Sequence, residues 1–321
     1  MILHNDKASF TAAIQTASDK LNILPVFIEK DYWITLILKR LNQSKFMDKV
    51  VFKGGTSLSK GYKLITRFSE DIDIAVLNVD QLSGNQVKTL IRDVEKAISI
   101  DLTCIEGHQG ESKGSRFRKS FFSYPGTGDE RFYQNISNKV IIEINSFANP
   151  FPFEKRPIIS LISASLAENN QQELIKKYDL MPFEINILHK NQTLLEKLVS
   201  LFRFSFENDP ISGISGKIRH FYDLYYLLLD KDCKAFIDAL DFPTQFNAIW
   251  SHDQSAFDDP ASWKGKTVYE SPLYVQFSNL WNLLKNIYSK ELSSLAFTPI
   301  PNEEKIADAF EYIVSKLPLS H

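Results

Sequence analysis

Hydrophobic residues recur along the first half of the chain with two different periods. Apolar residues three or four positions apart are typical of helices with one buried face, and residues 7–20 follow this spacing. Alternation of apolar and polar residues is typical of half-buried strands, as in residues 69–76. A succession of such segments predicts an α/β or α+β core. The predicted helices are 7–20, 26–41, 57–65 and 85–98, and the predicted strands are 49–53, 69–76, 101–105, 115–123 and 139–147.

Helical spacing dominates after Pro157, although residues 183–188 still read as a strand. Residues 241–271 are rich in Pro, Asp, Ser and Trp, and this composition predicts a long irregular connection. We therefore expect two domains, a sheet core with two leading helices over residues 1–157 and a mostly helical domain over 158–321 that contributes to the active site. The predicted helices of the second domain are 193–206, 217–229, 272–290 and 303–316.

The composition of the 321 residues, 44% hydrophobic and 24% charged, is that of a globular protein. The formal net charge of −2 excludes a uniformly basic nucleic-acid binder and leaves open a local basic groove. No apolar run approaches the roughly 20 residues that span a bilayer, and the first ten residues lack an apolar signal core. We expect a soluble, cytoplasmic protein without a membrane partner, and we expect Cys104 and Cys233 to be buried free thiols.

Residues 51–76 carry the most informative pattern, which begins with a strand that runs into Gly54 and Gly55. Glycines let the backbone turn sharply and approach a ligand closely. A helix that starts near Thr56 and Ser57 would offer free N–H groups and two hydroxyls to a phosphate. Taken alone, the same residues also fit an ordinary strand–helix turn.

Asp71 and Asp73 lie two positions apart on the following predicted strand, so both side chains share one face. Ile72 and Ile74 then point into the core. Adjacent carboxylates repel each other unless a cation lies between them, and oxygen ligands of this kind suit Mg²⁺ or Mn²⁺. An Asp-x-Asp pair also fits a solvent-exposed strand face.

Lys60, Arg67 and Ser69 lie between the glycines and the carboxylates. Cations beside a triphosphate would neutralise the charge that develops during phosphoryl transfer. Solvated surface charge is the alternative, and for Lys60 and Lys63 it is the preferred one. The order of strand, Gly-Gly turn, helix and return strand predicts that glycines and carboxylates meet at one sheet edge.

The segments Gly54-Gly55-Thr56-Ser57-Leu58 and Arg67-Phe68-Ser69-Glu70-Asp71-Ile72-Asp73 resemble motifs of the nucleotidyltransferase superfamily. The resemblance is closer to the AbiEii/AbiGii toxin family, which includes the MenT toxins. It implies a mixed sheet core with N-terminal helices and a mostly helical C-terminal domain. Residues 27–33 resemble the family's leading helix, and they also fit an amphipathic helix with internal charge pairs.

Two later segments, Glu196-Lys197-Leu198 and residues 217–224, resemble further motifs of this family. The resemblance implies that Lys197 and Asp223 belong to the active site. Read from the residues alone, Arg219 and Asp223 are four apart and would form an ion pair on one helix, with Lys197 as a surface charge. His220 would lie on the helix surface or make a satisfied polar contact.

A third metal-binding carboxylate is expected in this superfamily from a neighbouring strand, and Glu143 is the candidate by strand position. Glu143 and Asn145 alternate with apolar residues, so they point away from the core. A carboxylate on so apolar a strand requires a compensating metal ion or a basic neighbour.

Residues 115–121 alternate basic and aromatic side chains. Such a strand could line a groove for a nucleotide or a nucleic acid. A strand with one solvent-exposed face is the preferred alternative.

Together with the resemblance, these patterns predict a metal-dependent enzyme that moves a nucleoside monophosphate from a nucleoside triphosphate to an acceptor hydroxyl, with release of pyrophosphate. The resemblance implies RNA as acceptor, in particular the 3′ end of tRNA, a toxin–antitoxin or phage-defence role, and a cognate antitoxin as partner. A metal-dependent phosphohydrolase or nuclease and a non-catalytic nucleotide-binding protein are the alternatives. The predicted catalytic residues are Asp71, Asp73, Lys197 and Asp223; the predicted metal ligands are Asp71, Asp73 and Glu143; the predicted nucleotide-binding residues are Gly54, Gly55, Thr56, Ser57, Lys60, Arg67, Ser69 and Arg219.

Overall fold

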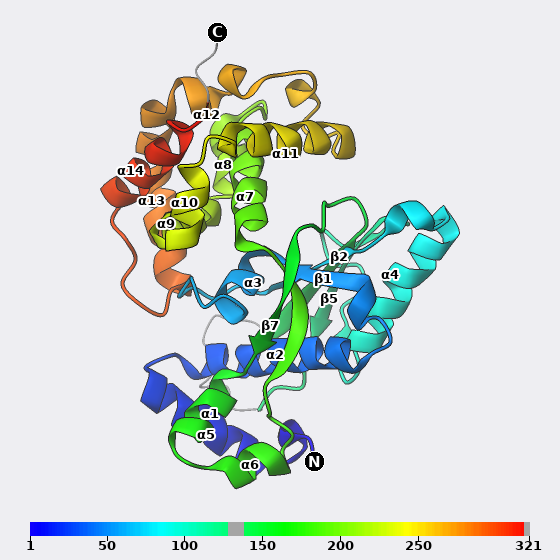
Figure 1. Ribbon diagram of the computed structural model, residues 1–321. Helices are drawn as coiled ribbons and strands as arrows, with labels where there is room; N and C mark the ends of the chain where they lie inside the picture. The colour runs from blue at the N-terminus through cyan, green and yellow to red at the C-terminus, as the bar shows by residue number, and fades with distance from the viewer. Residues whose placement is uncertain (128–137, 318–321) are drawn as a thin grey trace. The chain divides into compact units, whose positions relative to one another are not determined.

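The computed structural model describes residues 1–127 and 138–317, and the chain forms two compact units (Figure 1). The first unit comprises Met1–Tyr62 and Phe68–Leu188. The second comprises Lys63–Arg67 and the chain from His189 onward. The sheet of the first unit continues past residue 157, where the sequence predicted the domain boundary, so the last strand before the second unit ends at Leu188.

The first unit is built on a mixed sheet with the strand order β3-β5-β6-β2-β1-β8-β7, and β4 pairs with β5 outside this path. Neighbouring strands are antiparallel in β1–β2, β5–β6 and β7–β8, and parallel in β2–β6 and β1–β8. Its elements are α1 (Lys7–Leu21), α2 (Pro25–Gln43), β1 (Val50–Lys53), α3 (Gly54–Lys60), β2 (Asp71–Val76), α4 (Gly84–Ile98), β3 (Thr103–Cys104), β4 (Ser112–Lys113), β5 (Phe117–Ser123), β6 (Lys139–Asn145), β7 (Phe153–Ile158), α5 (Leu161–Glu168), α6 (Gln172–Lys177) and β8 (Phe183–Leu188).

Helix α4 packs against β5 and β6 and covers one face of the sheet. A capping box starts this helix, because the Ser83 side chain accepts from the Gln86 N–H while the Gln86 side chain accepts from the Ser83 N–H. Its Glu95 carboxylate accepts hydrogen bonds from Arg118 and Ser120 of β5. Phe117, Lys119 and Phe121 of β5 alternate with these two residues and therefore point to the opposite face of the sheet.

The second unit is helical, and α7 and α9 pack against each other within it. Its core is rich in aromatic rings, with Phe221 contacting both Trp281 and Phe310 at ring-centroid distances of 5.1 and 5.0 Å. Its helices are α7 (Lys190–Phe204), α8 (Pro210–Ser215), α9 (Arg219–Leu229), α10 (Lys231–Ile237), α11 (Phe242–Ala256), α12 (Pro272–Val275), α13 (Phe277–Leu295) and α14 (Glu303–Val314).

The mixed α/β fold that the sequence predicted is confirmed, but three local predictions are wrong. The helix predicted at 57–65 is α3, which ends at Lys60. The left-handed conformation of Lys63, with φ 56°, is incompatible with a helix over the rest of the predicted range. Residues 241–271 are not one irregular connection, since α11 buries Phe246 and Trp250 at helical spacing. Cys233 is buried as expected, whereas Cys104 lies on a two-residue strand at the sheet edge and is exposed.

None of the helices described over residues 1–127 and 138–317 is long and apolar enough to cross a membrane.

Candidate functional site

Four charged side chains form a row across four neighbouring strands of the first unit. Lys53 of β1 is in register with Asp73 of β2, and Asp73 is in register with Glu143 of β6. Glu143 is in turn in register with Lys119 of β5. Residues in register on neighbouring strands point to the same side, so two carboxylates lie in the middle of the row with a lysine at each end. Asp71, two positions before Asp73, shares this face.

Gly54 packs directly against the Asp73 carboxylate. Its φ of +79° lies in the left-handed region, and a Cβ atom added here would lie 2.0 Å from Asp73 Oδ2. Only glycine fits both constraints. The glycine turn and the carboxylate thus meet at one sheet edge, as the sequence predicted.

The hydroxyls of Thr56 and Ser57, which the sequence assigned to a phosphate, make internal hydrogen bonds in the structure. The Thr56 hydroxyl donates to the Asp71 carbonyl, and the Ser57 hydroxyl donates to the Gly54 carbonyl at 2.8 Å. Both side chains are buried, as is Ser69. Thr56 and Ser57 therefore hold the glycine turn in place beside the first residue of β2.

Lys119 and Glu143 form an ion pair with an Nζ–Oε1 distance of 2.6 Å. Burial lowers the pKa of Lys119, but the hydrogen bond and charge of Glu143, with a further contribution from Asp71 and Asp73, outweigh this and raise the pKa overall. Glu143 thus has the basic neighbour that the sequence allowed as the alternative to a metal ion.

The carboxylates at Asp71 and Asp73 fit a hard divalent cation, because Mg²⁺ is commonly held by one or two carboxylates together with water and substrate phosphates. A site built from protein ligands alone is not present: over residues 1–127 and 138–317, no three His, Cys, Asp or Glu side chains come together in an arrangement that could hold a metal ion. The predicted third ligand, Glu143, lies beside Asp73 but is engaged with Lys119.

Lys60 is buried and pairs with Asp31 of α2 at 2.6 Å, so the preferred prediction of a surface charge is wrong. Lys60 also donates to the Ile159 carbonyl at 3.0 Å, and the Asp31 carboxylate accepts from the Leu161 N–H at 2.7 Å. These contacts tie α3 to α2 and to the start of α5. They give Lys60 a structural role, and its nucleotide contact stays a prediction.

Two charged residues of α2 contact residues outside the helix, whereas one alternative predicted charge pairs within it. Lys30 forms an ion pair with Glu70, the residue before Asp71, and the Glu29 carboxylate accepts from the Thr127 N–H at 2.9 Å. Lys30 of α2 therefore positions the segment that leads into β2, while Glu29 contacts the segment after β5.

A second cluster lies within the second unit, where Asp223 of α9 accepts from two cations. Arg67 donates through two nitrogens at 2.8 and 2.6 Å, and Lys197 of α7 lies at 2.7 Å. All three are buried, with Asp223 at 0% exposure. Burial alone would raise the pKa of Asp223, but the charges of Arg67 and Lys197 outweigh it and hold the pKa well below its usual range. We refer to Arg67, Lys197 and Asp223 as the buried triad.

Arg219 does not pair with Asp223, so the predicted ion pair along α9 is wrong. Arg219 is the first residue of α9 and contacts Glu291 of α13 at 2.9 Å. Asp223 lies one turn further along, where it is fully buried. Its partners come from other segments because a buried carboxylate requires close compensating charge.

His220 was expected at the helix surface or in a satisfied polar contact, and the structure shows it half-buried with one ring nitrogen that no described residue satisfies. Its Nδ1 atom is buried and has no hydrogen-bond partner among the described residues. Burial, and then the charges of Lys197 and Lys217, lower the pKa of His220 well below its ordinary value. The imidazole is therefore neutral beside the buried triad.

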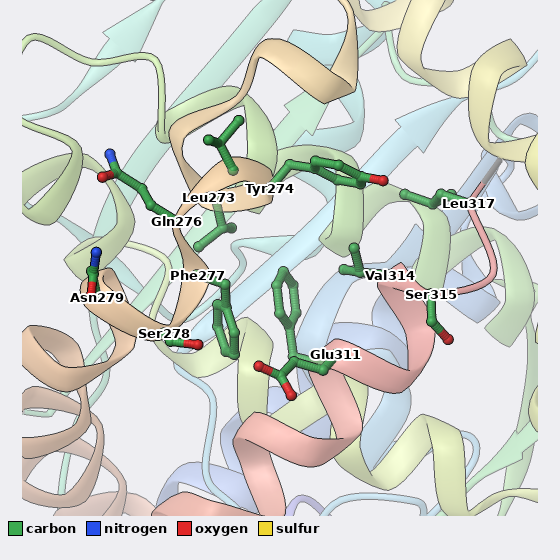
Figure 2. A pocket seen from close by; sticks show the side chains of 12 residues that line it. Leu273, Tyr274, Gln276, Phe277, Ser278, Asn279, Glu311, Val314, Ser315 and Leu317 are labelled. Atoms are coloured by element: carbon green, nitrogen blue, oxygen red, sulfur yellow. The ribbon is translucent and has the colours of Figure 1, made fainter. Parts of the chain in front are cut away.

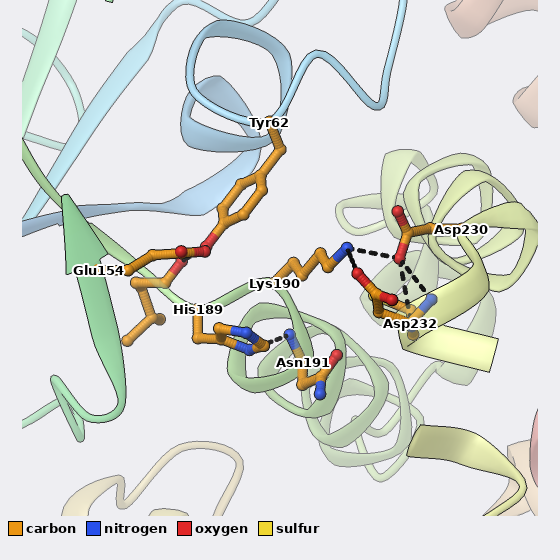
Figure 3. A network of polar contacts seen from close by, with 9 residues as sticks. Tyr62, Glu154, His189, Lys190, Asn191, Asp230 and Asp232 are labelled. Atoms are coloured by element: carbon orange, nitrogen blue, oxygen red, sulfur yellow. Dashed lines mark hydrogen bonds and ion pairs between the residues drawn. The ribbon is translucent and has the colours of Figure 1, made fainter. Parts of the chain in front are cut away.

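Ion pairs at the start of α7 hold this helix to the segment after α9. Lys190 contacts Asp230 at 2.7 Å and Asp232 at 2.8 Å, as Figure 3 shows. These contacts fix the two helices that supply Lys197 and Asp223.

The second unit also has a hollow of about 470 Å³, lined by residues 273–279 and by side chains from the last part of α14 and the segment after it (Figure 2). The described residues that line it include none of the predicted site residues. The hollow therefore shares no described lining residue with either charged cluster.

A sheet that sets a Gly-Gly turn against paired carboxylates of the next strand defines the first unit as a nucleotidyltransferase-type domain. The family model described as "Nucleotidyl transferase AbiEii toxin, Type IV TA system" matches residues 36–308, and the chain belongs to this family. The resemblance seen in the sequence is thus confirmed.

Two solved structures are similar to the chain at low identity. The nucleotidyltransferase toxin MenT4 (Rv2826c) of Mycobacterium tuberculosis H37Rv matches with a TM-score of 0.54 and 16% identity, over 90% of this chain and 84% of that chain. JHP933 from Helicobacter pylori matches with a TM-score of 0.34 and 15% identity, over 84% and 95% of the two chains. The similarity to MenT4 supports the fold alone. No curated protein matches the chain.

Proposed function

We propose that this chain transfers a nucleoside monophosphate from a nucleoside triphosphate to an acceptor hydroxyl on RNA, in particular the 3′ end of tRNA. The packing of Gly54 against the Asp73 carboxylate carries the proposal, because it lets a phosphate chain approach two adjacent carboxylates. Membership of a toxin family supports a role as the toxin of a toxin–antitoxin system, with an antitoxin as partner.

The face of Asp71 and Asp73 would hold Mg²⁺ or Mn²⁺, which supplies positive charge to the phosphate oxygens. The turn at Gly54 and Gly55 leaves room for the phosphates beside Asp73. Lys53 and Lys119, at the ends of the row, offset the charge of its carboxylates. We assign Glu143 to positioning Lys119.

In the proposed reaction, the oxygen of the acceptor hydroxyl forms a bond to the α-phosphorus. The bond between the α-phosphorus and the bridging oxygen breaks, and pyrophosphate leaves with that electron pair. The hydroxyl proton passes to a carboxylate of the row. Charge stabilisation and alignment of the reacting groups account for the catalysis of such transfers.

Within the second unit, we propose that Asp223 positions Arg67 and Lys197. Its carboxylate compensates both cations and holds their side chains in one arrangement. The catalytic role of Lys197 and the nucleotide contact of Arg219 stay predictions that substitution of each residue tests separately.

The decisive experiment incubates the purified protein with Mg²⁺, total tRNA and each labelled nucleoside triphosphate in turn. We expect label in tRNA with one triphosphate, and we expect Asp73→Ala to abolish it while the far-ultraviolet circular dichroism is unchanged. Asp80→Ala is the matched control, because Asp80 is an exposed aspartate outside the row. Full transfer by a folded Asp73→Ala protein would refute the proposal. Release of inorganic phosphate without labelled tRNA would instead indicate a hydrolase.

A further inference from the structure

We propose that the end of β5 nearest the carboxylate row, with the segment after β6, binds the single-stranded 3′ end of the acceptor RNA. The binding surface consists of Arg116, Phe117 and Phe147, which we call the aromatic ledge. In this proposal a base stacks on Phe117 and Phe147, and Arg116 contacts a backbone phosphate. The proposal rests on the proposed function, since it assigns the acceptor to a place beside the same carboxylates.

The strand register places Phe117 on the face that carries the carboxylates. Lys119 is in register with Glu143, and Phe117 is in register with Asn145, one step further along β6. Two residues of a strand span about 7 Å, so the Phe117 ring begins roughly one nucleotide away from the row. Arg118, between them, points to the opposite face, where Glu95 of α4 binds it.

The two aromatic rings of the ledge lie side by side and stay partly exposed. Their centroids are 5.9 Å apart with an interplanar angle of 48°. The Arg116 carbonyl accepts from the Ser146 N–H at 3.0 Å, and the Ala148 N–H donates to the Asn145 side chain at 3.1 Å. These bonds fix the backbone on both sides of Phe147, so the aromatic surface is formed before any ligand binds.

Arg116 supplies a positive charge next to these rings. It is exposed, it donates to the Ser146 hydroxyl at 3.5 Å, and no carboxylate pairs with it among the described residues. The neighbouring Lys113, by contrast, pairs with Glu111 at 2.9 Å. A guanidinium beside partly exposed aromatic rings is the combination that binds single-stranded nucleic acid through bases and phosphates together.

The position of Arg116 favours an RNA end over the base of the substrate triphosphate. The phosphates of the triphosphate belong at Gly54, on the Asp73 side of the ledge. Arg116 precedes Phe117 and lies beyond it, away from the row. A phosphate bound by Arg116 would therefore lie on the far side of the stacked base from the triphosphate, where an oligonucleotide has a backbone phosphate and a mononucleotide has none.

The test compares Phe117→Ala and Arg116→Ala with two matched controls. Phe151→Ala removes an aromatic side chain that is 46% exposed, from the segment before β7 at the other edge of the sheet. Arg92→Ala removes an arginine of α4 whose side chain is 62% exposed. We expect Phe117→Ala to raise the KM for tRNA on the order of 10-fold, with the KM for the triphosphate unchanged, and we expect Phe117→Trp to restore it.

A second measurement separates this proposal from the proposed function. Binding of a fluorescent single-stranded oligoribonucleotide is measured in the Asp73→Ala background, where no transfer occurs. We expect about 10-fold weaker binding with Phe117→Ala, and a smaller dependence on salt with Arg116→Ala. Binding that equals the controls in both variants would overturn the ledge even if transfer is found. Loss of binding without any transferase activity would support the ledge and refute the proposed reaction. An increase in the KM for the triphosphate instead of tRNA would overturn the choice of RNA.

Discussion

Replacing Asp223 by Asn tests whether the buried triad is held together by charge. The substitution keeps the shape of the side chain and removes the negative charge that contacts both Arg67 and Lys197. The cations of Arg67 and Lys197 then remain in a buried site, where the side chain of Asp223 has 0% exposure in wild type. Breaking a buried ion pair in this way costs about 3–5 kcal/mol, because the desolvation of the remaining charge is no longer compensated.

Lys197→Met is the matched variant, since it removes a charge from the same cluster and leaves the pair of Arg67 and Asp223 intact. The remaining pair is neutral overall and retains both guanidinium contacts, at 2.8 and 2.6 Å. Methionine also keeps most of the apolar stem of lysine. We therefore expect a cost below about 2 kcal/mol. The double variant combines Asp223→Asn with Lys197→Met. It should recover part of the stability lost in Asp223→Asn, because it removes one of the two cations that have lost the Asp223 carboxylate there.

Urea unfolding followed by tryptophan fluorescence measures these differences in the second unit, which contains Trp250, Trp263 and Trp281. The lowered pKa of Asp223 adds a pH test. Its ionised form stabilises the fold above the unfolded pKa of about 3.9, and this contribution is lost as the pH falls through the folded value. The difference between wild type and Asp223→Asn should therefore shrink below about pH 4. Equal costs for Lys197→Met and Asp223→Asn, or a double variant less stable than Asp223→Asn, would refute the reasoning.

Three further substitutions test other parts of the structure. Gly54→Ala should reduce transfer more than 10-fold and lower the free energy of unfolding on the order of 1–2 kcal/mol. Gly84→Ala is the control and should be neutral, because no atom lies within 4 Å of the added Cβ. Equal activity of the two variants would contradict the close approach of Gly54 to Asp73. Lys60→Met should lower the free energy of unfolding by about 3 kcal/mol, because it breaks the buried ion pair with Asp31. Lys63 is exposed, so Lys63→Met should change the same quantity by no more than about 0.5 kcal/mol. Similar values for the two variants in thermal unfolding would exclude a structural role for Lys60. His220 is neutral in the fold with a lowered pKa, so the stability of wild type should fall by up to about 1.4 kcal/mol per pH unit below about pH 6.5. His220→Gln should lack this part of the pH dependence. Parallel curves of stability against pH for the two proteins would contradict the lowered pKa.

The face of Asp71 and Asp73 could be predicted because it depends on local periodicity. Strand alternation assigns both carboxylates to one side and Ile72 and Ile74 to the core, and both isoleucines are fully buried. The same alternation predicts the outward side of Glu143. The register between β2 and β6 adds what the sequence lacks, namely that Glu143 lies beside Asp73. Strand β2 ends at Val76 and β6 begins at Lys139, so no short turn specified that register from sequence.

The partners of buried charges could not be predicted, because they lie far apart in the sequence. Asp223 is 156 residues from Arg67, and Asp31 is 29 residues from Lys60. Helical spacing favoured Arg219 for Asp223, since four-residue neighbours face each other on any helix. That rule describes exposed helix surfaces, where pairs are weak and solvent competes. A carboxylate without exposure is instead compensated by charges from other segments, which only the tertiary fold brings together.

The charge balance of the row explains why metal and triphosphate should bind together. Asp73 and Glu143 are directly opposite each other, an arrangement that is destabilising for like charges without compensation. Lys53 and Lys119 provide one positive charge each, while Asp71, Asp73 and Glu143 provide three negative charges, so the set carries one net negative charge. A triphosphate that approaches this face without a metal ion would be repelled by the net negative charge. A divalent cation removes that repulsion, and the phosphates complete its ligand set beside Asp71 and Asp73. Binding of the metal ion should therefore raise the affinity of the first unit for the triphosphate, and binding of the triphosphate should raise its affinity for the metal ion.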